Sequence, residues 1–153
     1  MTTLTLKIPP LLLVLIFATL MWLCQLALPL TLYDRNIAQP LMVLFVLIGG
    51  TIILTGAFAF KQAQTTVNPT KPETTTALVT NGIYQYTRNP MYLGMLCCLL
   101  GWGFYLANPM TILLILGFIF YINHFQIKPE EQMLTQLFHQ EFIDYCASVR
   151  RWL

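Results

Sequence analysis

Charged residues are scarce in this chain of 153 residues, where they make up 9% of the sequence while hydrophobic residues make up 57%. A soluble domain carries about 25% charged residues. The composition therefore excludes a soluble globular protein and indicates an integral membrane protein. The net charge is only +2 and is spread along the chain. A nucleic-acid partner, which needs a concentrated basic surface, is excluded as well.

Cysteine and histidine are also few, with four cysteines and two histidines in the whole chain. Cys24, Cys97 and Cys98 lie inside apolar runs, and no cysteine pair stands near His124 or His139. Metal sites and disulfide frameworks need closely spaced or regularly paired ligands. We therefore expect packing residues and free thiols, with no metal and no disulfide scaffold.

Long apolar runs are abundant, and the chain has four of them, at residues 11–32, 40–60, 91–106 and 110–127. A helix needs roughly 20 apolar residues to span a bilayer, so the third run is short unless Pro90 and its neighbours extend it. We expect Pro29 to kink the end of the first helix and Pro40 to begin the second. The fourth is expected to end at Lys128 and Pro129. Only Asn108-Pro109 separates the third and fourth runs, which predicts a helical hairpin.

The basic residues indicate how these spans are oriented. A four-span chain places the N-terminus, the second loop and the tail on one side, which would hold seven of the eight basic residues: Lys7, Lys61, Lys71, Arg88, Lys128, Arg150 and Arg151. The other side holds Arg35. By the positive-inside rule, both termini are expected in the cytoplasm. The membrane would be the plasma (inner) membrane of a bacterium or the endoplasmic reticulum of a eukaryote.

The tail has the pattern of an amphipathic helix. Pro129 suits the first helical position, and Glu130 and Glu131 suit the first turn. Apolar residues then recur every three or four positions: Leu134, Leu137, Phe138, Phe142, Tyr145 and Val149. This spacing predicts an interfacial helix, and Arg150-Arg151-Trp152 has the character of an interfacial anchor.

We therefore predict an all-α integral membrane bundle of about four transmembrane helices plus a C-terminal amphipathic helix. It would be one structural domain, with anchor helices in residues 1–72 and a catalytic core in residues 73–153.

The stretch from residue 78 to residue 94 concentrates polar, aromatic and turn-forming residues beside an apolar run. Asn81-Gly82 is a strong turn signal. Arg88 stands at the membrane edge, where a charge needs a partner. The helical hairpin would return Glu130 to the face from which Arg88 leaves. We therefore expect Arg88 and Glu130 to act together on one ligand, unless they pair with each other or each face water.

Two motifs in this order resemble a known family. The first is Leu78-Val-Thr-Asn-Gly-Ile-Tyr84 with Arg88-Asn-Pro90-Met-Tyr92-Leu-Gly94, and the second runs from Glu130-Glu131 to Arg151. Together they resemble the isoprenylcysteine carboxyl methyltransferases and the related phospholipid N-methyltransferases. The resemblance covers residues 78–152. It implies a membrane enzyme that uses S-adenosylmethionine to methylate a carboxyl oxygen or an amine of a lipid-like acceptor, and it leaves the oligomeric state open.

The resemblance also implies roles for single residues. The cofactor would be lined or bound by Leu78, Val79, Tyr84, Tyr86, Arg88, Asn89, Pro90, Tyr92 and Glu130. The charged groups with candidate catalytic roles are Arg88, Glu130 and Glu131. A weaker candidate is His139, which would serve as a base only if the acceptor is an amine.

Two positions depart from the family pattern. Thr76 stands where the family often has histidine, and Gln126 stands where it often has an arginine linked to substrate. Gln126 and Lys128 are therefore the candidate substrate-binding residues, with Lys128 as a replacement charge. The departures keep a rival interpretation open, a non-catalytic membrane protein of the same fold that binds a lipid or a partner. A nicotinamide-dependent reductase is less favoured, because only Arg88 and Lys128 are near enough to hold a 2′-phosphate.

Overall fold

The computed structural model describes residues 8–63 and 77–153. Every regular element in these residues is helical, which confirms the all-α prediction. The elements are α1 (Pro10–Ala27), α2 (Arg35–Gln62), the 3-10 turn η2 (Gly82–Gln85), α3 (Pro90–Leu106), α4 (Thr111–Ile122), the π-helical turn η3 (Asn123–Ile127) and α5 (Lys128–Ser148). Lys7, Lys71 and Thr76 lie outside the described residues.

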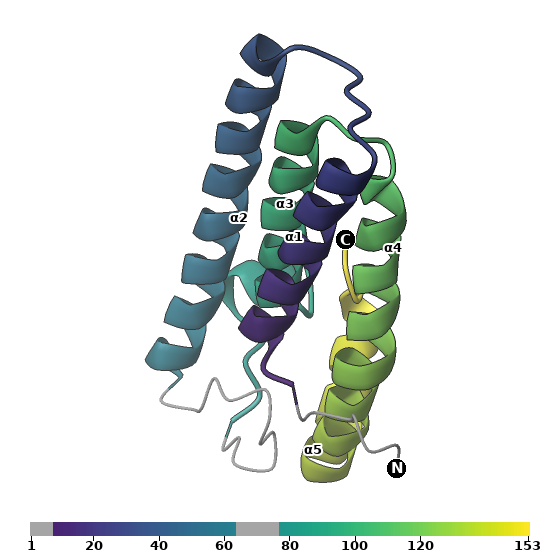
Figure 1. Cartoon of the computed structure of the whole chain (residues 1–153). Coiled ribbons are helices and arrows are strands. Elements are labelled where there is room, and N and C mark those ends of the chain that lie inside the picture. The colour runs from purple at the N-terminus through teal and green to yellow at the C-terminus, as the bar shows by residue number, and fades with distance from the viewer. Residues whose placement is uncertain (1–7, 64–76) are drawn as a thin grey trace.

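Within residues 8–63 and 77–153, three helical segments are long and apolar enough to cross a membrane: α1, α2 and the continuous helix that begins with α4. The fourth, α3, is apolar but shorter. The helices run alternately up and down (Figure 1), so the start of α1, the end of α2 and the start of α3 lie at one end of the bundle. This arrangement is the one that a four-span chain requires. Which end faces the cytoplasm remains a prediction.

Helices α2 and α3 are packed closely because glycines stand where they cross. A Cβ atom added to Gly94 would lie 2.6 Å from the carbonyl oxygen of Gly49, and one added to Gly49 would lie 2.5 Å from that of Gly94. One added to Gly101 would lie 3.0 Å from the Met42 carbonyl oxygen. Real Cβ atoms do not approach other atoms as closely as 2.5 or 2.6 Å, so Gly49 and Gly94 need to be glycine, while the contact at Gly101 would be tight. Gly94 and Gly101 of the third run therefore allow α2 to approach, whereas Gly103 faces Met21 of α1 and Ile115 of α4.

Helix α1 is fixed to the hairpin by polar groups that interrupt the apolar runs. The Trp102 indole nitrogen donates to the Ala18 carbonyl oxygen at 3.0 Å. The Asn108 amide donates to the Gln25 side-chain oxygen and to the Leu28 carbonyl oxygen, each at 2.7 Å. A polar group in hydrocarbon needs a partner. These side chains therefore determine where α1 can dock.

Two helix boundaries near the N-terminal spans differ from the sequence prediction. Helix α1 ends at Ala27, so Pro29 follows the helix and does not kink it. Helix α2 already begins at Arg35, and Pro40 lies inside it. The carbonyl that Pro40 leaves without an intrahelical donor belongs to Asn36, which is exposed in the first turn, and proline is tolerated so near a helix start.

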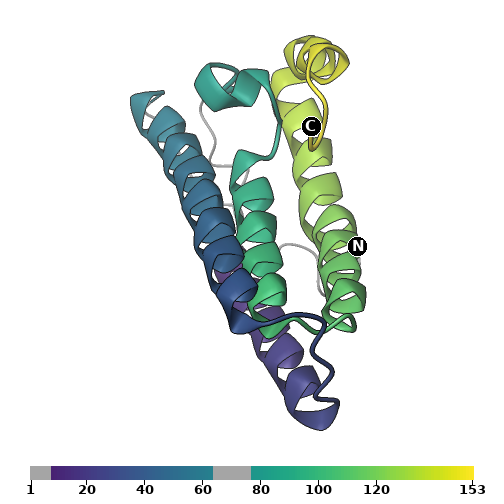
Figure 2. The same ribbon diagram turned by 90° about the horizontal axis from the view of Figure 1, so that it is seen from above.

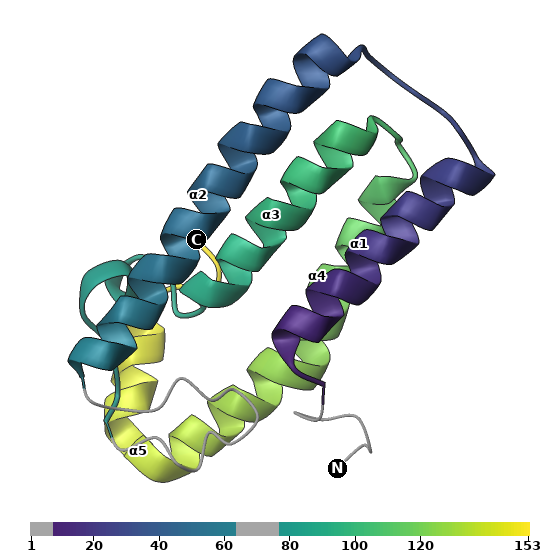
Figure 3. The ribbon, with the colours of Figure 1, turned by 60° about the vertical axis from the view of Figure 1, so that its left-hand side comes forward.

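The sequence predicted that the helix of the fourth span would end at Lys128 and Pro129, but the helix does not end there. The helix continues through η3 into α5. A π turn holds one extra residue, and this gives space to the proline ring and accommodates its missing N–H. The break comes later, at His139, whose φ of 46° and ψ of −120° are not helical. The predicted tail helix is therefore two segments, and its end turns back beneath the bundle (Figure 3).

Candidate active site

The site lies at the end of the bundle where η2 and the last segment of α5 meet (Figure 2). Gly82 has a φ of 64°, which lets the chain turn as the Asn81-Gly82 signal predicted. The turn buries Tyr84, whose ring packs edge-on against Phe60 at 5.4 Å. The Tyr145 hydroxyl donates to the Tyr84 carbonyl oxygen at 2.6 Å. The central stretch and the tail are thereby joined.

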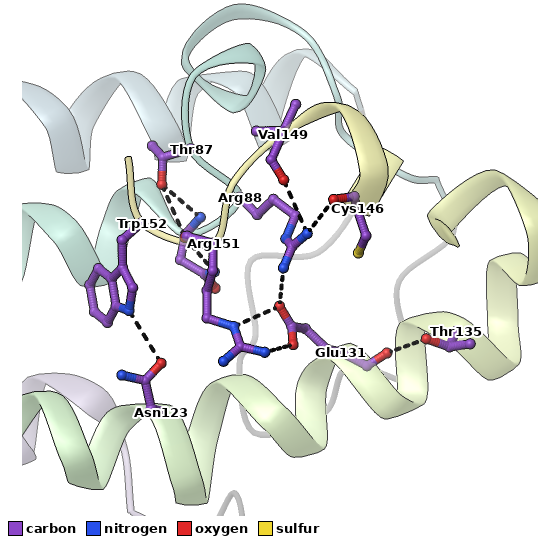
Figure 4. Close-up of polar contacts among 10 residues, drawn as sticks. Thr87, Arg88, Asn123, Glu131, Thr135, Cys146, Val149, Arg151 and Trp152 are labelled. Atoms are coloured by element: carbon purple, nitrogen blue, oxygen red, sulfur yellow. Dashed lines mark hydrogen bonds and ion pairs between the residues drawn. The ribbon is translucent and has the colours of Figure 1, made fainter. Parts of the chain in front are cut away.

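Arg88 is bound on several sides (Figure 4). Its Nη1 donates to the carbonyl oxygens of Cys146 and Val149 at 2.9 and 3.0 Å. Its Nη2 pairs with Glu131 Oε1 at 2.9 Å. Its Nε is buried and has no hydrogen-bond partner within the described parts of the chain. Arg88 therefore caps the C-terminal end of α5, and its Nε–H is a donor that could bind a ligand.

Glu131 is shared between two arginines, because Arg151 pairs with it from the other side. The last residues, 149–153, form a segment that we call the C-terminal strap. The Arg88 backbone N–H donates to the Arg150 carbonyl oxygen at 3.0 Å. The Trp152 indole donates to Asn123 Oδ1 at 3.2 Å (Figure 4). Arg151 and Trp152 thus hold the strap against the helices. The interfacial anchor that the sequence indicated stays a prediction.

Glu130 faces a different neighbour. The Tyr92 hydroxyl donates to Glu130 Oε2 at 3.1 Å, and Tyr92 is only 6% exposed. Among the residues that the structure describes, Arg88 and Arg151 form ion pairs with Glu131, and no basic side chain forms one with Glu130. Glu130 lies beyond the last apolar residue of the fourth span. Burial raises the pKa of its carboxyl to about 7; the Tyr92 hydrogen bond opposes this rise and the charge of Glu131 adds to it.

The remaining predicted cofactor residues divide into two groups. Pro90 and Val79 are buried, Leu78 is half-buried, and the Asn89 amide donates to the Arg151 carbonyl oxygen at 3.0 Å. These four residues lie at the same end of the bundle as Glu130. Tyr86 is 75% exposed and lines a groove beside α2. The structure therefore separates Tyr86 from the others.

The candidate substrate residues do not lie together. Gln126 is fully buried in the π turn and donates to the Ile8 carbonyl oxygen at 2.8 Å, so it contacts the chain just before α1. Lys128 is exposed, and so is His139 at the break in α5. The π turn also supplies Asn123, the partner of Trp152. No pattern in the sequence pointed to Asn123, and Trp152 was expected only as part of the interfacial anchor Arg150-Arg151-Trp152, which gave no sign of this hydrogen bond.

The helical bundle and the apolar spans define a multi-pass membrane protein. The sequence model of a family described as phospholipid methyltransferase matches residues 38–141, which is more than half of the chain. The chain belongs to this family of membrane methyltransferases, and S-adenosylmethionine is the cofactor that the family generally uses. No solved structure gives a significant match.

Named relatives support the same family. A protein-S-isoprenylcysteine O-methyltransferase of Saccharomyces cerevisiae is 32% identical over 76 residues, which are 50% of this chain and 32% of that protein. One of Dictyostelium discoideum is 40% identical over 75 residues, 47% of this chain and 30% of that protein. An uncharacterized protein of Haemophilus influenzae is 44% identical over 63 residues, 41% of this chain and the whole of that protein. The matches to the isoprenylcysteine enzymes thus cover only about a third of their length.

Proposed function

We propose that this protein is an S-adenosylmethionine-dependent methyltransferase that acts on a lipid-like acceptor within the membrane. The observation that carries the proposal is the environment of Glu130. This carboxylate is half-buried next to the hydroxyl of Tyr92, while the neighbouring Glu131 takes both Arg88 and Arg151. Glu130 is therefore the acidic group available to form an ion pair with a cationic ligand.

The argument is one of charge. Removing a carboxylate from water costs free energy when no cation is beside it. The pKa of the Glu130 carboxyl is raised for this reason. A ligand with a positive group beside Glu130 would remove this cost. S-adenosylmethionine carries an α-ammonium group and a sulfonium, so it has the charge that the site lacks.

The other residues fit the same cofactor. The unpartnered Nε of Arg88 is a donor suited to the cofactor carboxylate. The buried ring of Tyr84 and the apolar side chain of Val79 are suited to the adenine and ribose faces. Glu131, held between two arginines, is better suited to position Arg88 than to contact the cofactor.

When bound, the cofactor supplies an electrophilic methyl group on its sulfonium. The chain's task is then to hold the cofactor and the acceptor in line and to keep water out, and positioning of this kind can supply much of a rate enhancement. The strap serves this task because it covers the start of α3 and fixes Arg88. Neither a metal nor a covalent intermediate is needed.

The proposal is tested with detergent-purified protein. Titration with S-adenosylmethionine should give saturable binding, and incubation with methyl-labelled cofactor and a membrane lipid extract should give a labelled lipid. Glu130→Gln should weaken the binding. Absence of cofactor binding by the folded wild-type protein would contradict the proposal. Binding without any labelled lipid would favour the rival interpretation, a membrane protein that keeps the fold and the pocket without catalysis.

A further inference from the structure

A groove with a volume of about 810 Å³ lies between α2 and η2. It is lined on the α2 side by Thr51, Ile52, Leu54, Thr55, Phe58, Ala59 and Gln62, and on the η2 side by Gly82, Ile83 and Tyr86. Figure 3 shows η2 beside the lower end of α2. Because α2 is a candidate membrane span, most of this groove would open towards lipid.

The polar side chains in the middle of the groove are already satisfied. The Thr51 hydroxyl donates to the Leu47 carbonyl oxygen at 2.8 Å. The Thr55 hydroxyl donates to the Thr51 carbonyl oxygen at 2.9 Å. Both hydrogen bonds lie within α2, so these hydroxyls have no need of a ligand. The groove is therefore suited to hydrocarbon along its length.

The length and polarity of the groove match one leaflet of a bilayer. From Thr51 to Gln62 the helix rises about 16 Å at 1.5 Å per residue, roughly half of the 30 Å hydrocarbon layer. Its polar end holds Gln62 and the exposed ring of Tyr86, and tyrosine is typical of the membrane interface. A lipid chain lying in the groove would thus place its head group at the level of η2.

We propose that this groove holds an acyl chain of the phospholipid acceptor; the inference rests on the proposed function. Tyr84 and Tyr86 stand two positions apart, with Tyr84 in the buried cluster and Tyr86 in the groove. The η2 turn therefore lies between the groove and the buried cluster that contains Tyr84, and in our proposal the head group lies at this turn, next to the proposed cofactor site. An acyl chain gains no hydrophobic free energy when it moves from the bilayer into this groove, because both surroundings are apolar. We therefore expect the groove to orient the acceptor, while contacts of the head group supply the binding affinity.

Photolabelling tests the groove directly. Wild-type protein is placed in phosphatidylcholine vesicles with a trace of phosphatidylethanolamine that carries a diazirine in one acyl chain, and the labelled peptides are identified. Labelling should be enriched at the groove over Leu15 of α1, which is 64% exposed and lies near the start of its helix, at the same end of the bundle as the end of α2. Thr55→Trp, which fills the groove, should remove the enrichment, and the matched control Leu15→Trp should leave it intact. Even labelling of both faces would overturn the proposal.

Competition and activity complete the test. Excess unlabelled phosphatidylethanolamine should remove the enrichment, whereas competition by farnesol alone would overturn the acyl assignment in favour of a prenyl chain. Thr55→Trp should reduce methyl transfer to lipid while its affinity for S-adenosylmethionine stays at the wild-type value. Unchanged transfer would overturn the acceptor role. Enriched labelling in a wild-type protein that binds no cofactor would instead refute the proposed function and leave a lipid site.

Discussion

The neighbouring residues Glu130 and Glu131 are predicted to have separate roles, and substitution of each by glutamine tests this. The two changes keep the shape of the side chain and remove its charge. In Glu131→Gln, Arg88 and Arg151 lose their shared counter-ion, so we expect a less stable protein. In Glu130→Gln, no ion pair with a described basic residue is lost, so we expect a stability close to the wild-type value and a weaker affinity for the cofactor.

The expected loss of stability in Glu131→Gln can be worked out from the exposure of the side chains involved. Its side chain is 18% exposed and that of Arg88 is 13% exposed, so this pair is mostly shielded from water. Arg151 is 33% exposed, and its contribution is discounted because exposed pairs are worth little. A hydrogen bond to a charged group contributes about 1.5–3 kcal/mol. We therefore expect Glu131→Gln to lower the free energy of unfolding by about 2 kcal/mol.

For Glu130 the quantity of interest is the dissociation constant of S-adenosylmethionine. We expect Glu130→Gln to raise it at least tenfold, which corresponds to about 1.4 kcal/mol. This is a modest demand for a charge-assisted contact.

Thermal unfolding in detergent, with and without S-adenosylmethionine, measures both effects, since a ligand of the folded state raises the melting temperature. The matched control is Glu141→Gln, an exposed carboxylate on α5 that should change neither stability nor affinity. A Glu130→Gln protein that loses stability but binds as tightly as wild type would show that Glu130 is structural. A Glu131→Gln protein with wild-type melting would refute the role of Glu131 in holding the strap.

Three further predictions concern the packing, the pH response and the topology. Gly94→Ala should lower stability by about 1–3 kcal/mol through overpacking, whereas Gly50→Ala, where an added Cβ meets nothing within 4 Å, should not; equal melting of the two proteins would contradict the close α2–α3 contact. Glu130, with its pKa raised to about 7, is a carboxylate above that pH and neutral below it, so the cofactor affinity should fall as pH drops from 8 to 6, and a flat titration curve would be evidence against the contact. Reporter fusions after Arg35 and after Lys71 should lie on opposite sides of the membrane; finding both on one side would disprove the four-span topology.

Several features of this protein follow from the sequence alone. Long apolar runs with few charges must be helices in a membrane, because a backbone in hydrocarbon has to satisfy its own hydrogen bonds. The turn at Asn81-Gly82 and the start of α3 at Pro90 are local features, since each depends on the conformations open to a few residues. The family is also encoded locally, in two motifs that each lie within one continuous stretch of the chain.

The tertiary structure decided which charges meet. The sequence placed Arg88 and Glu130 at one end of the bundle, but neighbouring residues on a helix point about 100° apart, and the phase of that helix depends on the π turn before Pro129. The structure consequently directs Glu131 to Arg88 and leaves Glu130 to Tyr92. The break at His139 and the strap that it allows were equally beyond local analysis. Both depend on contacts between residues far apart in the chain, and no periodicity within one segment reports such contacts.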